Sequence, residues 1–133
     1  MVEKTGRTEE VVRALFEHWT SGDDLTPYVA EDAVLVSAMA PGREYRGPEG
    51  ARAYRRDADR EGLEITPTVH DVFIKGERAL VTGSLLVKSG VAVDRLDLVW
   101  GCRLEEGKLA EGRAFMRRAD AWRWFDPTGA DDR

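Results

Sequence analysis

The first hydrophobic pattern in the chain has the period of a helix. Its apolar positions are spaced by three, one and three residues, so they share one helical face; they are Val12, Leu15, Phe16 and Trp19. Thr8 precedes them and can cap the first free amide groups. Gly22 follows them and is typical of a helix end. The pattern predicts a helix from Thr8 to just before Gly22.

From residue 63 onward the hydrophobic period changes to alternation, which is typical of strands. Short turns that each contain a glycine separate the alternating stretches, as antiparallel hairpins require. The predicted strands are residues 63–74, 79–88, 92–104 and 109–117. A last helix is predicted at residues 119–125.

Three shorter elements are predicted before the alternating stretches. Pro27 fits the first turn of a helix, a β-forming run around Leu35 favours a strand, and Gly47 opens another helix. The core face of that helix carries Tyr54 as its only large side chain. The corresponding ranges are residues 27–30, 33–40 and 47–62.

This order of elements is typical of the α+β class, with helices gathered on one face of a strongly curved antiparallel sheet. One domain over residues 8–126 fits a chain of 133 residues, with flexible segments at 1–7 and 127–133. Several strands are apolar on both faces: Val81 alternates with Leu80. The helices cover one face only, so we expect a second copy to cover the other, as in a two-fold homodimer.

Composition narrows the choice of partners. The formal net charge is −5, which argues against binding nucleic acid or an anionic membrane. Residues 113–125 mix arginine with aromatic side chains, which we interpret as a terminal helix packed on the sheet.

The single Cys102 is interpreted as a small buried hydrophobe. The two histidines do not have the sequence spacing of metal ligands, which argues against a metal site. No cofactor is expected, and the absence of an export signal predicts a cytoplasmic location.

Three stretches of the sequence resemble a known superfamily. They are WTSGDDL with AEDAV (residues 19–25 and 30–34), YRGPEGA (45–51), and VWGCRLEEGK with RAF (99–108 and 113–115). Together they are similar to the nuclear-transport-factor-two-like superfamily, most closely its SnoaL-like branch. The resemblance implies a conical sheet whose concave face, together with the N-terminal helices, encloses an apolar pocket. It does not imply one chemistry, because the superfamily includes isomerases, dehydratases, epoxide hydrolases, cyclases and inert binding domains.

The catalytic residues of two of these enzyme types are missing at the matching positions. Where the ketosteroid isomerases carry a tyrosine and two aspartic acids, this sequence has Leu15, Ser37 and Trp100. Limonene-type epoxide hydrolases use an aspartate–arginine–aspartate network. Here the matching segment 82–87 has no charge, and Ala114 stands near the place of the second aspartate.

Three titratable residues remain as catalytic candidates: His70, Tyr54 and Asp97. His70 partly matches the pocket histidines of scytalone-type dehydratases and is a natural general base; it can equally be a structural residue at a sheet edge or dimer face. Tyr54 can donate a hydrogen bond to a ligand or pack in the core. Alternation places Asp97 on the back of the sheet with Arg95, which favours an ion pair. His18, beside the helical stripe, is interpreted as a surface residue.

The predicted ligand contacts are mostly aromatic, which suits a flat apolar molecule. They are Phe16, Trp19, Leu35, Ser37, Tyr54, Trp100, Arg113 and Phe115. Arg113 and Phe115 point the same way, so Arg113 either binds an acidic group in the pocket or pairs outside it. The sequence predicts a SnoaL-like domain that binds a small hydrophobic ligand. The alternative is a cofactor-independent acid–base enzyme (isomerase, dehydratase, cyclase or hydrolase) acting on such a molecule.

Overall fold

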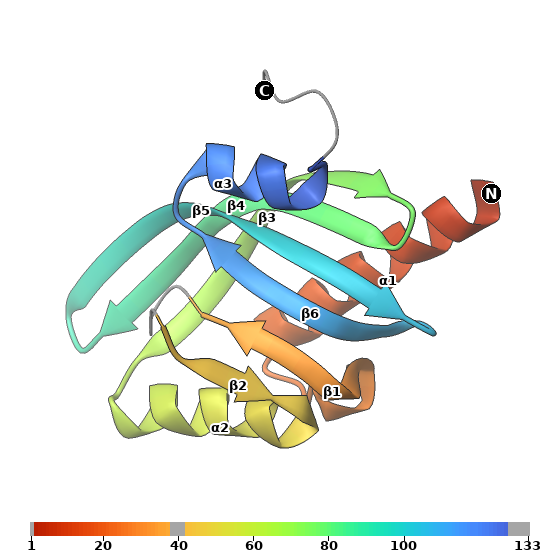
Figure 1. Ribbon diagram of the computed structural model, residues 1–133. Coiled ribbons are helices and arrows are strands. Elements are labelled where there is room, and N and C mark those ends of the chain that lie inside the picture. The colour runs from red at the N-terminus through yellow and green to blue at the C-terminus, as the bar shows by residue number, and fades with distance from the viewer. Residues whose placement is uncertain (1, 38–41, 128–133) are drawn as a thin grey trace.

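The chain folds as an α+β domain around one six-stranded sheet. The computed structural model describes residues 2–37 and 42–127 (Figure 1). Its helices are α1 (Val2–Ser21), the short 3-10 helix η1 (Thr26–Tyr28), α2 (Gly47–Arg60) and α3 (Arg118–Phe125). Its strands are β1 (Val29–Val36), β2 (Glu44–Arg46), β3 (Glu64–Lys75), β4 (Arg78–Ser89), β5 (Ala92–Glu105) and β6 (Lys108–Phe115). The predicted fold class, a curved sheet with helices packed on it, is confirmed.

The sheet is mixed rather than purely antiparallel. Its order is β2-β1-β6-β5-β4-β3, and β3 to β6 form the predicted antiparallel meander. β1, however, runs parallel to β6 and pairs Leu35 with Gly112. The prediction was wrong here because hairpin signals report only on strands that follow each other in sequence. The end of the strand predicted at 33–40 and the tail from residue 128 lie outside the described residues.

The first helix begins earlier than predicted, and Thr8 lies inside it rather than at its start. α1 starts at Val2, and Thr8 lies buried within it. Its hydroxyl donates a hydrogen bond to the carbonyl of Gly76, 2.9 Å away in the turn between β3 and β4. Thr8 therefore fastens the helix to the sheet instead of capping it.

The end of α1 forms a Schellman motif, which explains the place of His18. The amide of Gly22 donates to the carbonyl of Trp19, and the amide of Asp23 donates to that of His18, with Gly22 at a φ of +81°. His18 Nδ1 lies 2.8 Å from the Asp23 carboxylate, and its Nε2 lies 3.0 Å from the hydroxyl of Tyr28. His18 is thus a partly buried link between α1 and η1, not the solvated residue that the sequence suggested.

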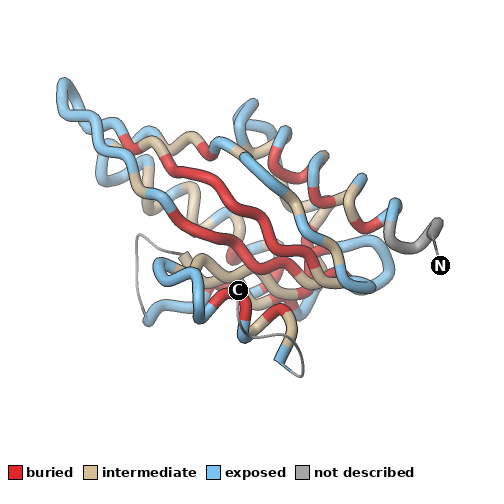
Figure 2. Tube along the Cα trace, turned by 90° about the horizontal axis from the view of Figure 1, so that it is seen from above, coloured by how far each residue is buried: buried red, intermediate tan, exposed pale blue. Residues whose placement is uncertain are grey.

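The two faces of the sheet carry separate hydrophobic layers. On the inner face, α1 packs on β3 and β4 while α2 packs on β1 and β2, and the core there includes Val81. On the outer face, Trp122 and Phe125 of α3 pack on Leu80 and Val99. The middle of β4 and β5 is buried between these layers, whereas the tip of their hairpin is exposed (Figure 2).

The position of α3 changes the argument for a dimer. From the apolar alternation we expected a second copy of the chain to cover the whole second face of the sheet. Instead, α3 of the same chain covers the apolar residues at one end of that face (Figure 1). The homodimer therefore stays a prediction. In the described part of the chain, no helix is long and apolar enough to cross a membrane.

Candidate functional site

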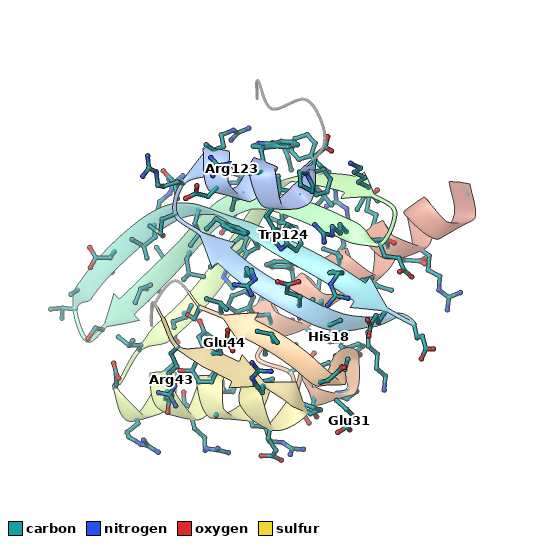
Figure 3. The ribbon with its side chains drawn as sticks, in the orientation of Figure 1. His18, Glu31, Arg43, Glu44, Arg123 and Trp124 are labelled. Carbon is teal, nitrogen blue, oxygen red and sulfur yellow. The ribbon has the colours of Figure 1, made fainter. Side chains whose placement is uncertain are left out.

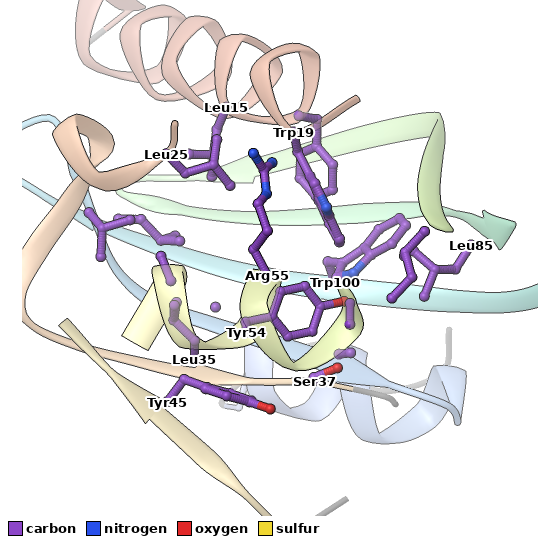
Figure 4. A pocket seen from close by; sticks show the side chains of 18 of the residues that line it. Leu15, Trp19, Leu25, Leu35, Ser37, Tyr45, Tyr54, Arg55, Leu85 and Trp100 are labelled. Atoms are coloured by element: carbon purple, nitrogen blue, oxygen red, sulfur yellow. The ribbon is translucent and has the colours of Figure 1, made fainter. Parts of the chain in front are cut away.

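A cavity of about 750 Å³ lies between α1, α2 and the inner face of the sheet (Figure 4). This volume falls within the range of roughly 300–1,000 Å³ that is typical of small-molecule sites. On β6, small residues leave room for the cavity. Gly112 and Ala114 of β6 both line it, and neither has the bulk to fill the space under the helices.

Aromatic rings form a connected wall around this cavity. Trp100 of β5 lies edge-on to two rings of α1, with centroid distances of 4.9 Å to Phe16 and 5.9 Å to Trp19. Trp19 lies 6.2 Å from Tyr54 of α2, which in turn lies 5.6 Å from Tyr45 of β2. Edge-to-face pairs of this kind hold one another in place. The rings therefore form a continuous, mostly apolar surface.

The buried ionisable groups of the cavity keep their protons. Burial raises the pKa of Tyr54, against the opposing effect of a hydrogen bond with Ser37. Burial also raises the pKa of the Cys102 thiol to about 12. The pKa of Tyr45 is raised by burial and by its hydrogen bond to Asp57, whose carboxylate lies 2.8 Å from the phenol oxygen. At neutral pH Tyr54 and Cys102 can donate hydrogen bonds, whereas Tyr45 already donates its hydroxyl to Asp57. None of the three is a base at that pH.

Carboxylates occur only at the exposed rim of the described lining. Asp24, Asp59 and Glu64 line the cavity and are all exposed to solvent. Leu15, Ser37, Trp100 and Ala114, the four residues that the sequence analysis aligned with catalytic positions, also line the cavity. Besides the half-buried Arg55, the described interior therefore offers aromatic surface and neutral donors rather than acid–base pairs.

The structure separates the three catalytic candidates. Tyr54 lines the cavity. His70 is exposed on the edge strand β3, outside the described lining, at a bulge between Val69 and Asp71. Asp97 is also exposed and outside the lining, and its carboxylate lies 3.3 Å from Arg95 on the same strand.

Most of the predicted ligand contacts do meet at the cavity. Those whose side chains line it are Phe16, Trp19, Leu35, Ser37, Tyr54 and Trp100. Phe115 instead packs on Trp124 of α3, on the outer face. Arg113 borders the cavity, but its guanidinium bonds to Glu111 on the outer side of β6. The alternation correctly paired Arg113 with Phe115, and α3 decides that both point outward.

Much of the cavity lining was missed at the level of sequence, including Tyr45 and Arg55. Arg55 extends from α2 toward the end of α1, between Leu25 and Trp19 (Figure 4). Its guanidinium donates to the carbonyl of Gly22 at 2.6 Å. No sequence signal distinguishes it from the neighbouring arginines, because its place depends on where α1 ends relative to α2.

Comparison with known proteins agrees with this architecture. The family model described as "SnoaL-like domain" matches residues 12–112, while no curated protein matches the chain. Bal32a, from a soil-derived mobile gene cassette, superposes with a TM-score of 0.74 at 21% identity, covering 92% of this chain and 98% of its own. TerC, co-crystallized with polyporic acid, gives 0.74 at 17% identity over 92% and 99%.

A third solved structure is an LEH-like epoxide hydrolase from M. tuberculosis. It superposes with a TM-score of 0.73 at 14% identity, covering 91% of this chain and 90% of its own. Identities this low establish a shared fold and leave the chemistry open. The family model spans most of the chain, and the resemblance seen in the sequence is confirmed. The chain belongs to the family of SnoaL-like domains, which have the nuclear-transport-factor-two-like fold.

Proposed function

We propose that this domain binds a small, flat and mostly apolar molecule in its cavity and does not convert it. The observation that carries the proposal is a cavity of about 750 Å³ with aromatic walls, whose buried ionisable groups all stay protonated. Aromatic walls suit a flat ring, since each face or edge can make an offset or perpendicular contact. The co-crystallization of TerC with polyporic acid is in keeping with a small-molecule site in this fold.

The chemistry of the described lining favours binding over acid–base catalysis. A general base must be deprotonated and within hydrogen-bond reach of the proton it removes. The raised pKa values of Tyr54 and Cys102 keep both groups in their acid forms. The lining carboxylates are solvent-exposed, so they lack the burial that commonly activates a catalytic acid.

A cofactor-independent acid–base enzyme is the second candidate, and Tyr54 is the observation that favours it. A buried phenol beside Ser37 can donate to a carbonyl oxygen and thereby stabilise negative charge on it. The variant Tyr54→Phe separates the two functions. In a binding domain it changes affinity modestly, whereas in an enzyme that uses the phenol it abolishes turnover while leaving most of the binding intact.

Native mass spectrometry of the protein as purified from its own cells tests the proposal. We expect an additional mass of a few hundred daltons that is lost on denaturation. Ala114→Trp is the matched control, because its side chain enters the cavity from β6 and should expel the ligand while the protein stays folded. A ligand that Ala114→Trp retains would contradict the proposal. The same spectra count subunits and so test whether the proposed homodimer forms.

A further inference from the structure

Two charged residues of the described lining are half-buried, and both are arginines: Arg55 of α2 and Arg113 of β6. Arg113 pairs with Glu111 on the outer side of the sheet, so Arg55 is the half-buried charge on the side of the cavity. The lining arginines of α2 are Arg52, Arg55 and Arg56, and the lining carboxylates are Asp24, Asp59 and Glu64. Of these six described residues, only Arg55 is half-buried, and the others are exposed. A partly desolvated charge is stabilised by a counter-charge, and Arg55 lies between Leu25 and the Trp19 ring (Figure 4).

The contacts of Arg55 leave most of its hydrogen-bonding capacity available. A guanidinium has five N–H donors, and the partner in the described structure is the carbonyl of Gly22, at 2.6 Å. No described carboxylate forms an ion pair with Arg55. Its remaining donors lie between Leu25 and Trp19, over the cavity (Figure 4).

The nearby acidic residue Asp24 is already engaged elsewhere. One of its oxygens accepts the amide of Thr26 at 3.1 Å, and the other accepts the hydroxyl of Thr26 at 3.0 Å. These bonds are the main reason that the pKa of Asp24 is lowered, with a smaller contribution from the charges of Arg52 and Arg55. Asp24 therefore holds the turn into η1, and Arg55 is left to face a ligand.

We propose that the cavity selects an acidic aromatic molecule, with Arg55 binding its carboxylate or other anionic oxygen while the ring lies against Trp19 and Trp100. This inference rests on the proposed binding function and assigns the ligand its charge. A guanidinium can bind a carboxylate with two parallel hydrogen bonds. A neutral ligand would leave those donors to water, and a cationic ligand would be repelled by Arg55.

Isothermal titration calorimetry with a matched set of ligands tests the charge preference. The probes are 2-naphthoate, the neutral 2-naphthamide, and a 2-naphthyl trimethylammonium salt. Charge-assisted hydrogen bonds at a half-exposed site favour the anion by about tenfold in Kd, so we expect 2-naphthoate to bind about tenfold more tightly than the amide and the cation to bind most weakly. Raised salt should narrow the gap between anion and amide.

Variants identify the residue that creates this preference. Arg55→Gln should lower the affinity for 2-naphthoate much more than the affinity for the amide, so that the tenfold advantage of the anion is lost, and Arg55→Lys should retain part of that advantage. Arg60→Gln is the control, since it removes the same charge from an exposed position of α2 outside the described lining. It should leave the ratio of the two affinities unchanged.

The outcomes distinguish this inference from the proposed function. Equal binding of anion and amide by the wild type, or tighter binding of the cation, would overturn the inference and leave the binding function standing. An Arg55→Gln variant that weakens anion and amide equally would show that Arg55 only shapes the cavity, and would overturn it too. If none of the probes binds, the proposed function fails together with the inference.

Discussion

The pKa values of ionisable groups shift for different reasons on the two faces of the sheet. On the inner face, burial raises the pKa values of Tyr54 and Cys102, so these groups stay neutral. On the outer face, burial would also raise the pKa of Glu111, but hydrogen bonds and charge from Arg113, Arg103 and Trp124 lower it. Beside the cavity, the inner face has neutral donors and a single half-buried cation of the described α2, Arg55, whereas the outer face has the ion-pair network of Glu111 with Arg103 and Arg113.

The two faces also differ in how completely they are filled. On the outer side, the Trp124 ring comes so close to β5 that a Cβ on Gly101 would lie 2.7 Å from it. Figure 3 shows Trp124 between α3 and the sheet, and the Arg78 guanidinium lies 4.7 Å from the centre of its ring. On the inner side, Gly112 and Ala114 face the cavity. Tight packing by α3 therefore stabilises a sheet whose other face can remain hollow.

The largest expected loss of stability comes from Gly83→Ala, which tests whether the whole inner face of the sheet has free space. A Cβ on Gly83 of β4 would lie 2.0 Å from the backbone oxygen of Thr68 and 3.1 Å from the Trp100 ring. Because the oxygen belongs to the backbone of β3 and cannot move aside, Gly83→Ala should lower the free energy of unfolding by more than about 3 kcal/mol. Urea denaturation measures this.

Gly112→Ala is the matched control on the same face. Its Cβ would meet only the flexible ends of Leu109 and Leu35, at 3.3 and 3.4 Å. We expect a change below about 1 kcal/mol, because side-chain ends beside a cavity can shift. Equal losses for Gly83→Ala and Gly112→Ala would show that the space at β6 is not available.

The next effect compares the two hydrophobic layers directly. Leu80 is fully buried under α3, and Leu85 is 2% exposed and lines the cavity. Leucine-to-alanine changes cost about 2–5 kcal/mol, depending on how tightly the surroundings pack around the side chain. Leu80→Ala should therefore cost about 4 kcal/mol and Leu85→Ala about 2, since atoms that border a void have fewer neighbours to begin with. A larger loss for Leu85→Ala in urea denaturation would reverse the comparison.

Local patterns predicted the meander closely but not the pairings between distant segments. Alternation and glycine turns placed the four long strands within two residues of their observed bounds. The parallel pairing of β1 with β6 and the short strand β2 were missed, because each depends on contacts that no local pattern records. A hairpin signal joins neighbours in the chain, whereas Leu35 and Gly112 meet only after the helices have packed.

The part of the site that could be predicted is the part that alternation assigns to one face of the sheet. Trp100 and Cys102 were assigned to one face, and both belong to the inner core. Alternation cannot say which face is inner, so the direction of Arg113 stayed open until α3 was placed. His70 lies at a bulge that interrupts the alternation, and Arg55 reaches the cavity only through the fold.

At alkaline pH, the titration of Cys102 on the inner face should lower the free energy of unfolding. The pKa of Cys102 is raised from 9.0 to about 12, so the folded state holds a proton that the unfolded chain loses. Its contribution to stability is complete below pH 9 and is lost as the pH rises toward 12. The slope is about 1.4 kcal/mol per pH unit, or about 2 kcal/mol at pH 10.5. Cys102→Ala should flatten this decline between pH 9 and 10, as measured by urea denaturation.

At acid pH, the titration of Glu111 on the outer face should lower the free energy of unfolding, by less than Cys102 does at alkaline pH. The pKa of Glu111 is lowered in the folded state, so its contribution is complete above its ordinary pKa and is lost as the pH falls through the folded value. Glu111→Gln should therefore cost about 1–2 kcal/mol at pH 7 and progressively less below pH 4.5. Glu105→Gln is the control, because Glu105 pairs with Arg103 while more exposed, and a pair of that kind is worth at most about 1 kcal/mol. If Glu111→Gln changed stability equally at pH 7 and pH 3, the charge of the outer network would contribute nothing, and the two faces would differ in packing alone.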